Sequence, residues 1–163
     1  MSLPPLLSGA EALARVLALM APTETETIPL AEAAGRVLRA PVVARRDQPP
    51  FAASAMDGYA VRAAEAIAGA TLTVDGEIAA GAEPGPPLPA GACRRIFTGA
   101  PLPEGADAVL IQEDAAREGD RVTSKETPKP GANVRPAGLD FRVGGRIPAP
   151  RRLAPADLAL AAS

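Results

Sequence analysis

Prolines and glycines constrain the fold of this chain more than any other feature of its sequence. There are 19 prolines and 15 glycines among 163 residues. Proline interrupts helices and central strands, and glycine favours turns. Their combined share stays below the ~25–30% typical of low-complexity disordered segments. The sequence therefore predicts a folded, turn-rich α+β protein that is mainly β.

The chain is long enough for one domain or two small ones. At this length about 70% of the surface of the unfolded chain becomes buried on folding. Because there are only three phenylalanines, one tyrosine and no tryptophan, the core must be aliphatic.

Two absences limit the possible chemistry. The chain has no histidine, which excludes a Ser-His-Asp triad and histidine-ligated zinc within it. Cys93 is its single cysteine, so neither an intrachain disulfide nor a cysteine zinc cluster can form, as fits a reducing compartment. Cys93 itself is interpreted as a small core residue. Oxygen donors remain, and these bind hard cations and oxyanions.

The charge and hydropathy patterns argue against two classes of partner. A net charge of −2 does not favour nucleic acid, and no apolar run approaches the ~18 residues of a membrane span. Residues 1–7 lack a positive charge and contain two prolines, so they are interpreted as a leader and not as a signal peptide.

Helices are predicted at three places. Ser8 and Glu11 have the spacing of a capping box for a helix over residues 9–20, which Pro22 ends. The other two are a short helix over 31–34 and a last helix over 156–162 that starts at Pro155. Since this last helix stops after about two turns, we expect the chain to be the front part of a longer protein.

Short apolar segments predict the strands, which are residues 37–44, 59–62, 92–97, 108–112 and 146–153. Pro41 confines the first of these to an edge or a kink. Residues 71–80 form either a hairpin or one strand with a bulge, 81–91 a surface loop, and 107–126 a hairpin. Arg94 and Arg95 are expected to be exposed charges.

The segment 54–60 (Ser-Ala-Met-Asp-Gly-Tyr-Ala) is the first candidate for chemistry. It offers the Ser54 hydroxyl, the Asp57 carboxylate and free backbone N–H groups, which suit Mg²⁺ or a phosphate-like oxyanion. Gly58 is expected to turn the chain sharply after the carboxylate. The alternative is an ordinary turn that caps its own backbone.

Two further loops combine glycine or proline with polar side chains. They are residues 98–101 and 135–140, and each lies next to a predicted strand. Together the three loops favour one shared oxygen-rich site, although each alone is ordinary turn chemistry. Glu113 is a weaker fourth member, with a solvated strand-end charge as the alternative.

Three blocks of sequence carry a family resemblance. Residues 49–60, residues 95–109 with Gln112-Glu113, and residues 131–140 are similar to the N-terminal blocks of the molybdopterin molybdenumtransferase family. This family is called MoeA in bacteria and the gephyrin E domain in animals. The blocks occur in family order, and the resemblance covers roughly residues 8–163.

The resemblance implies an enzyme of molybdenum cofactor biosynthesis. Such enzymes insert molybdenum from molybdate into molybdopterin-AMP with the help of Mg²⁺, and release AMP. They are elongated cytoplasmic homodimers that follow a molybdopterin-adenylylating protein in the pathway. Their cleft lies between the second domain of one subunit and the third domain of the other. The third and fourth domains would follow Ser163, so we expect this chain alone to be inactive.

The resemblance implies that Asp57, Thr98 and Asp140 line the cleft, and the pattern of the three loops adds the other expected site residues. The residues expected in catalysis are Asp57, Thr98 and Asp140. Those expected to bind the cofactor are Ser54, Gly58, Gly99 and Arg135. Those expected to ligate the metal are Asp57, Asp140 and Glu113.

The predicted architecture is a compact β domain, 48–140, inserted into a smaller, discontinuous α/β dimerisation domain, 8–47 and 141–163. Two functions from other classes stay open. One is a non-catalytic dimerisation or scaffold module, and the other is a stand-alone Mg²⁺- or oxyanion-binding domain.

Overall fold

A computed structural model describes residues 7–21 and 23–163 of the protein. These residues form two compact units, one made of the chain up to Ala40 with Ala149–Ala162, the other of Pro41–Pro148. The predicted leader, apart from Leu7, and the helix stop at Pro22 lie outside the described residues. The predicted domain boundaries at 47/48 and 140/141 stay a prediction.

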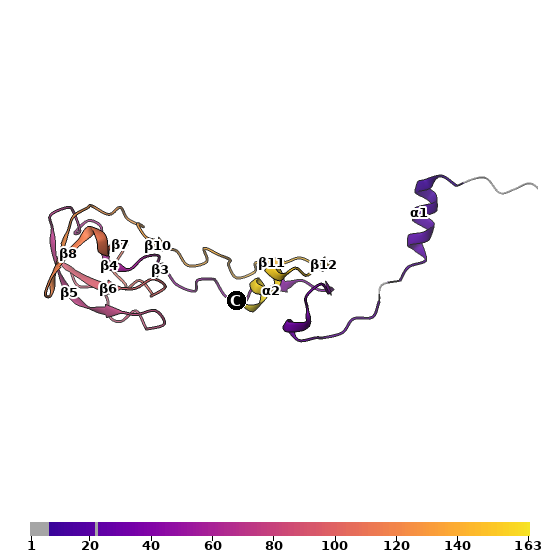
Figure 1. Ribbon diagram of the computed structural model, residues 1–163, viewed down its shortest axis with the longest axis horizontal. Helices are drawn as coiled ribbons and strands as arrows, with labels where there is room; N and C mark the ends of the chain where they lie inside the picture. The colour runs from indigo at the N-terminus through magenta and orange to yellow at the C-terminus, as the bar shows by residue number, and fades with distance from the viewer. Residues whose placement is uncertain (1–6, 22) are drawn as a thin grey trace, which may run out of the picture. The chain divides into compact units, whose positions relative to one another are not determined.

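The second unit is built on a curled six-stranded sheet (Figure 1). Its strands lie in the order β7 (Ala108–Ile111), β4 (Gly58–Val61), β6 (Ala92–Ile96), β5 (Thr71–Ile78), β9 (Arg121–Ser124) and β8 (Ala115–Glu118). All neighbours are antiparallel except β5 and β6, which are parallel. The mainly β prediction is therefore confirmed.

Strand β4 lies at the centre of the packing because all four of its residues are buried. Successive side chains of a strand point to opposite faces. Tyr59 and Val61 accordingly join one buried cluster and Ala60 joins a second. The core is aliphatic apart from Tyr59, as predicted. Cys93 is buried in the first cluster, and this burial raises the pKa of its thiol to about 12.

Three short antiparallel ladders join distant parts of the chain. Within the second unit, β3 (Ala53–Ser54) pairs with β10 (Val134–Arg135), and β2 (Val42–Val43) pairs with β11 (Arg146–Ile147). Within the first unit, β1 (Val37–Leu38) pairs with β12 (Arg151–Arg152). The first of these ladders positions the candidate site.

The first unit also contains the helices α1 (Gly9–Ala18) and α2 (Pro155–Ala162) and the 3₁₀-helix η1 (Leu30–Glu32). The predicted capping box of α1 is present, with both reciprocal hydrogen bonds between Ser8 and Glu11. Helix α2 begins at Pro155, as predicted. The short helix of one to two turns expected over 31–34 is present as the single 3₁₀ turn η1, which starts one residue earlier. No helix in the described part of the chain is long and apolar enough to cross a membrane.

Three predictions about strands were wrong. The strand predicted over 146–153 is divided into β11 and β12, which pair with β2 and β1 respectively. The strand predicted over 37–44 is divided at Pro41 into β1 and β2, which pair with different partners. The hairpin predicted over 107–126 is confined to β8 and β9. The 3₁₀-helix η2 (Gln112–Asp114) separates β7 from β8, so β7 pairs with β4 at the opposite edge of the sheet. Residues 71–80 contain one strand with a register shift between Val74 and Glu77, which is the bulge alternative.

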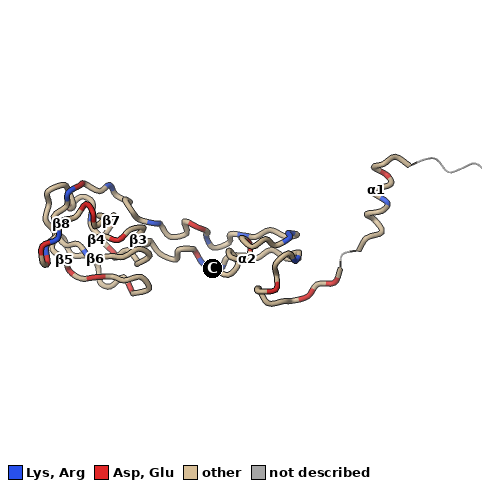
Figure 2. The backbone as a smooth tube through the Cα atoms, viewed as in Figure 1, with Lys and Arg blue, Asp and Glu red and all other residues tan. Residues whose placement is uncertain are grey.

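Arg94 was predicted to be exposed but is 5% exposed. Its Nε donates to Asp75 Oδ1 at 2.9 Å, and its Nη1 donates to the carbonyls of Pro84 and Pro86 at 3.2 and 2.7 Å. The bulged strand β5 supplies the carboxylate, and the loop over 81–91 supplies the carbonyls. A buried charge is tolerated only when it is paired and hydrogen-bonded, and these contacts meet that requirement. Figure 2 shows charged residues of both signs along the chain.

Candidate functional site

The Asp57 carboxylate lies between β3 and β4 and is held by Thr98. Asp57 Oδ1 accepts hydrogen bonds from the Thr98 backbone N–H at 2.9 Å and from the Thr98 hydroxyl at 2.8 Å. These two bonds hold the pKa of the Asp57 carboxyl below its usual range, and the bond from the backbone N–H has the larger effect. The positive charge of Arg95 lowers this pKa further. Asp57 is therefore ionised at neutral pH. The structure thus joins two of the residues predicted for catalysis.

Gly58 has a different role from the predicted sharp turn. Its φ angle is not positive, and it is the first residue of β4. A Cβ atom at this position would lie 2.1 Å from the Leu110 carbonyl oxygen and 2.9 Å from Ile111 Cα. Glycine is needed here because β7 passes too close to β4 for any side chain.

Gly99 turns the chain directly after Thr98, the residue that holds the Asp57 carboxylate. Its φ of +84° lies in the left-handed region that glycine adopts readily. Its N–H donates to the Ser54 carbonyl at 2.9 Å. This bond ties the Thr98 loop to β3, three residues before Asp57.

Ser54 is fully buried, and its hydroxyl donates to the Met56 carbonyl at 2.6 Å. Such side-chain to backbone bonds stabilise turns. The structure therefore gives this hydroxyl a role in shaping the segment that carries Asp57.

Asp140 and Arg135 form a pair of their own. Arg135 Nη2 lies 2.7 and 2.8 Å from the two Asp140 carboxylate oxygens, and both side chains are about half exposed. The ladder between β10 and β3 brings their loop beside the Asp57 segment, where Ala55 N–H donates to the Asn133 carbonyl at 2.9 Å. Direct convergence of Asp140 on Asp57 and Thr98 stays a prediction.

Glu113 lies exposed on η2, where its Oε1 accepts from the Gln112 side-chain amide at 3.3 Å. Within residues 7–21 and 23–163, no three histidine, cysteine, aspartate or glutamate side chains form a group that could hold a metal ion. The oxygen donors still suit Mg²⁺, since Mg²⁺ is commonly bound by one or two carboxylates, several waters and substrate phosphates. Binding of Mg²⁺ by these carboxylates stays a prediction.

Sequence reasoning missed two polar residues beside Asp57. Arg95 donates to the Gly58 carbonyl at 3.3 Å and to Gln112 Oε1 at 2.9 Å. The Gln112 N–H donates to the Asp57 carbonyl at 3.1 Å. The alternation of strand β6 could have identified Arg95, because adjacent Arg94 and Arg95 must point to opposite faces.

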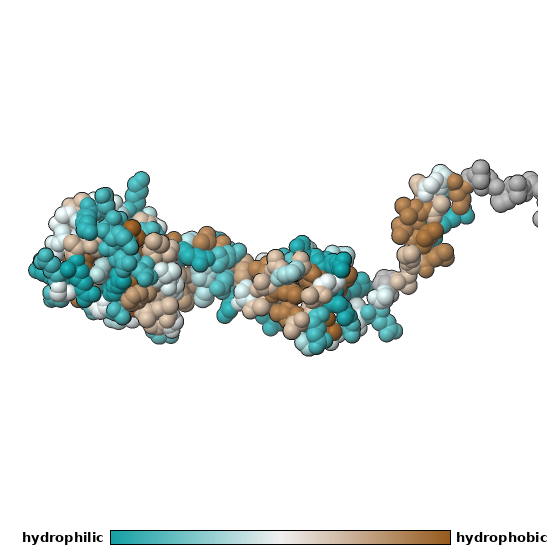
Figure 3. Space-filling view, in the orientation of Figure 1, coloured by the Kyte–Doolittle hydropathy of each residue, from teal (hydrophilic) through white to brown (hydrophobic). Residues whose placement is uncertain are grey.

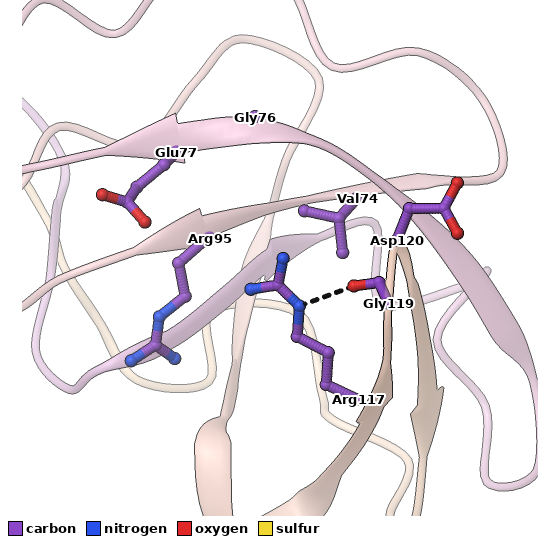
Figure 4. Close-up of a pocket in the computed structure, with 7 residues that line it drawn as sticks. All are labelled: Val74, Gly76, Glu77, Arg95, Arg117, Gly119 and Asp120. Atoms are coloured by element: carbon purple, nitrogen blue, oxygen red, sulfur yellow. Dashed lines mark hydrogen bonds between the residues drawn. The ribbon is translucent and has the colours of Figure 1, made fainter.

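A hollow of about 470 Å³ lies on the sheet next to this cluster (Figure 4). The residues that line it are Val74, Gly76, Glu77, Arg95, Arg117, Gly119 and Asp120. Arg117 Nε donates to the Gly119 carbonyl at 2.9 Å, as the dashed line in Figure 4 shows. Asp57 and Thr98 do not line the hollow, but Arg95, which does, also contacts Gly58 and Gln112 beside Asp57.

Comparison with protein families identifies one match. The family described as "MoeA N-terminal region (domain I and II)" matches residues 7–163. A molybdopterin molybdenumtransferase of Haemophilus influenzae is 40% identical over 144 residues, which cover 87% of this chain and 36% of that protein. One from Nostoc sp. is 40% identical over 146 residues, covering 86% and 34%. The chain thus spans about a third of the length of these curated relatives.

Solved structures agree with the sequence comparisons. The crystal structure of a molybdopterin biosynthesis MoeA protein from Pyrococcus horikoshii superposes with a TM-score of 0.84 at 30% identity. The superposition covers 97% of this chain and 42% of that one. A second crystal structure of a MoeA protein from Pyrococcus horikoshii gives a TM-score of 0.77 at 36% identity. The family match over nearly the whole chain, with these relatives, shows that the chain belongs to the MoeA N-terminal region family.

Proposed function

We propose that this chain is the N-terminal portion of a molybdopterin molybdenumtransferase of molybdenum cofactor biosynthesis. The whole cytoplasmic enzyme takes molybdopterin-AMP from a molybdopterin-adenylylating protein, inserts molybdenum from molybdate and releases AMP. The observation that carries the proposal is the Asp57 carboxylate, which Thr98 holds through two hydrogen bonds across 41 residues of sequence. Relatives named molybdopterin molybdenumtransferase support it further.

The proposed role of Asp57 follows from its two oxygens. Thr98 occupies Oδ1, whereas Oδ2 accepts no hydrogen bond from the described residues. Oδ2 is therefore available to a magnesium-bound water or directly to Mg²⁺. A bound Mg²⁺ would supply positive charge to the phosphate of the leaving AMP.

The other predicted residues act around this carboxylate. Asp140 supplies a second carboxylate, and Arg135 neutralises it. Glu113 lies beyond Gln112 as a further oxygen donor. Ser54, Gly58 and Gly99 shape the backbone on which Asp57 and Thr98 are carried.

The surroundings of the carboxylates support a second wall contributed by another subunit. Met56 and Leu139, the chain neighbours of Asp57 and Asp140, are 45% and 55% exposed, and Phe51, which precedes Asp57 in the same segment of the chain, is 42% exposed. We infer that a downstream domain of the partner in a homodimer covers these side chains. In this arrangement the β domain, 48–140, is inserted into a dimerisation domain, 8–47 and 141–163.

A chimeric enzyme tests the proposal. Residues 7–163 replace the matching region of the Haemophilus influenzae relative, and the chimera is introduced into bacteria that lack their own molybdopterin molybdenumtransferase. We expect restored activity of a molybdenum-dependent enzyme in these cells. With purified protein, we expect AMP release from molybdopterin-AMP by the chimera and none by the isolated chain.

The substitution Asp57→Asn in the chimera keeps the shape of the side chain and removes its charge. We expect turnover to fall by at least ~10²-fold, because a pre-positioned charge at a reacting group is lost. Asp120→Asn is the matched control, since Asp120 is exposed and Thr98 donates its two hydrogen bonds to Asp57 and not to Asp120. Full turnover in Asp57→Asn would remove Asp57 from the site and favour the scaffold alternative.

A further inference from the structure

The Arg95 side chain on β6 is held between two aromatic rings. Its guanidinium carbon lies 5.3 Å from the centre of the Tyr59 ring and 4.8 Å from that of the Phe97 ring. Tyr59 is its register partner on β4. A cation within about 6 Å of a ring is attracted to the ring face, so the two rings restrict where the guanidinium can point.

The guanidinium is directed at the backbone that surrounds Asp57. One nitrogen donates to the carbonyl of Gly58, the next residue in the chain. Another donates to the side chain of Gln112, whose own N–H donates to the Asp57 carbonyl. Arg95 therefore contacts both neighbours that fix the backbone of Asp57.

Arg95 takes part in none of the ion pairs that the described residues form. Those pairs use Arg36, Arg62, Arg94, Arg135 and Arg151. The guanidinium of Arg95 instead donates hydrogen bonds to the Gly58 carbonyl and to the side-chain amide oxygen of Gln112. Planar guanidinium groups suit this use, because several donors have fixed relative directions.

We propose that Arg95 is a positioning residue for Asp57: by anchoring Gly58 and Gln112, it keeps the Asp57 carboxylate on Thr98. The consequence for catalysis rests on the proposed function. The effect of Arg95 on the position of the Asp57 carboxylate does not rest on that function, because it concerns only contacts within this chain. Small displacements of a reacting group reduce rates strongly, so the position of one carboxylate matters.

Arg117 provides a matched control for Arg95, because both side chains line the hollow shown in Figure 4. The side chain of Arg117, however, donates a hydrogen bond to the Gly119 carbonyl in its own turn. Arg95→Met and Arg117→Met each replace a guanidinium with an unbranched apolar side chain. Only the first removes contacts to Gly58 and Gln112.

The first measurement uses the full 163-residue chain labelled with ¹⁵N. The Thr98 amide reports the bond to Asp57, because hydrogen bonding to a carboxylate shifts its proton resonance. We expect this resonance to move in Arg95→Met, to stay in place in Arg117→Met and to be intermediate in Arg95→Lys. An unmoved Thr98 resonance in a folded Arg95→Met or Arg95→Lys chain would overturn the proposal.

The second measurement is steady-state kinetics on the chimera described above. We expect kcat to fall by ~10-fold or more in Arg95→Met, as for other residues that orient a catalytic group, with KM nearly unchanged. Arg95→Lys should restore part of the loss, and Arg117→Met should retain full activity. Equal losses in the two methionine variants would overturn the proposal. An inactive wild-type chimera would instead count against the proposed function, and the Thr98 resonance would then decide the role of Arg95.

Discussion

At the scale of single residues, Gly58 meets the tightest steric limit near the candidate site. The Leu110 carbonyl oxygen occupies the place that a Cβ atom would take. The same close approach lets β4 pair with β7 on one edge and β6 on the other, with Asp57 immediately before the paired segment. Steric contact thus sets where the carboxylate emerges from the sheet.

We expect Gly58→Ala to destabilise the second unit by about 3 kcal/mol, because a methyl group must push β4 and β7 apart. Tyr59 is the only tyrosine, the chain has no tryptophan, and Tyr59 is 5% exposed. Its fluorescence during urea unfolding therefore reports this unit specifically. Gly9→Ala is the control, since nothing lies within 4 Å of a Cβ atom there. Equal unfolding midpoints for the wild type and Gly58→Ala would contradict this steric explanation.

At the scale of elements, the two helices begin with related contacts. Helix α1 has a complete capping box between Ser8 and Glu11. Before α2, the Ala154 N–H donates to Asp157 Oδ2 at 2.9 Å, which is one half of such a box. Arg151 completes the arrangement, with its Nε 3.0 Å from the same oxygen. Strand β12 and helix α2 are thereby joined by one 6%-exposed carboxylate.

The hydrogen bond from Arg151, and after it that from the Ala154 N–H, lowers the pKa of Asp157 below its ordinary value of 3.8. A carboxyl whose pKa is lower in the folded state stabilises that state above its unfolded pKa. This contribution is lost as the pH falls through the folded pKa. We expect the Ala154 amide resonance, followed from about pH 6 to about pH 2, to shift with a midpoint below 3.8.

Arg151→Gln tests the cause of that shift. Removing the guanidinium removes the largest influence on Asp157 and should raise the midpoint toward 3.8. Arg152→Gln is the neighbouring control, since Arg152 Nε donates to the Gly35 carbonyl and not to Asp157. The same midpoint in Arg151→Gln and the wild type would show that Arg151 does not control this carboxyl.

At the scale of the whole molecule, local sequence patterns predicted single elements better than they predicted which distant strands pair. The Ser8–Glu11 spacing predicted α1 correctly, because a capping box is complete within four residues. The partner of β7 lies about 50 residues earlier in the chain, and no short-range pattern specifies such a pairing. The strand predicted over 37–44 was wrong for the same reason, since its two halves pair with separate segments of the C-terminal part.

The candidate site shows the same division. The residue pattern identified Asp57 and Thr98, which the structure joins by two hydrogen bonds. It missed Arg95 because a charged residue on a short strand is usually solvated, and only the pairing of β4 with β6 places it over Tyr59. Arg94 was judged wrongly because its partner Asp75 lies in the bulged part of β5, which sequence alone left ambiguous.

Assembly is the prediction that concerns the whole chain. Helix α1 has no buried residue, and Leu13, Val16 and Leu17 on its apolar face are 60%, 51% and 56% exposed. Figure 3 shows apolar side chains over much of the visible face of this helix. Surfaces of this kind commonly mark interfaces. We therefore expect a homodimer that buries this face, with a mass in light scattering of about twice the 16.5 kDa of one chain.

Two substitutions on α1 test this assembly. Leu17→Glu places a charge on the apolar face and should shift the equilibrium toward the monomer by tenfold or more, since burying an unpaired carboxylate is costly. Arg15→Glu places the same side chain on the opposite face of the helix, because residues two apart are separated by about 200°, and should leave the dimer intact. A wild-type chain that stays at 16.5 kDa at high concentration would contradict dimerisation of this region alone. Equal dissociation by both variants would contradict the assignment of the interface to the face that carries Leu13 and Leu17.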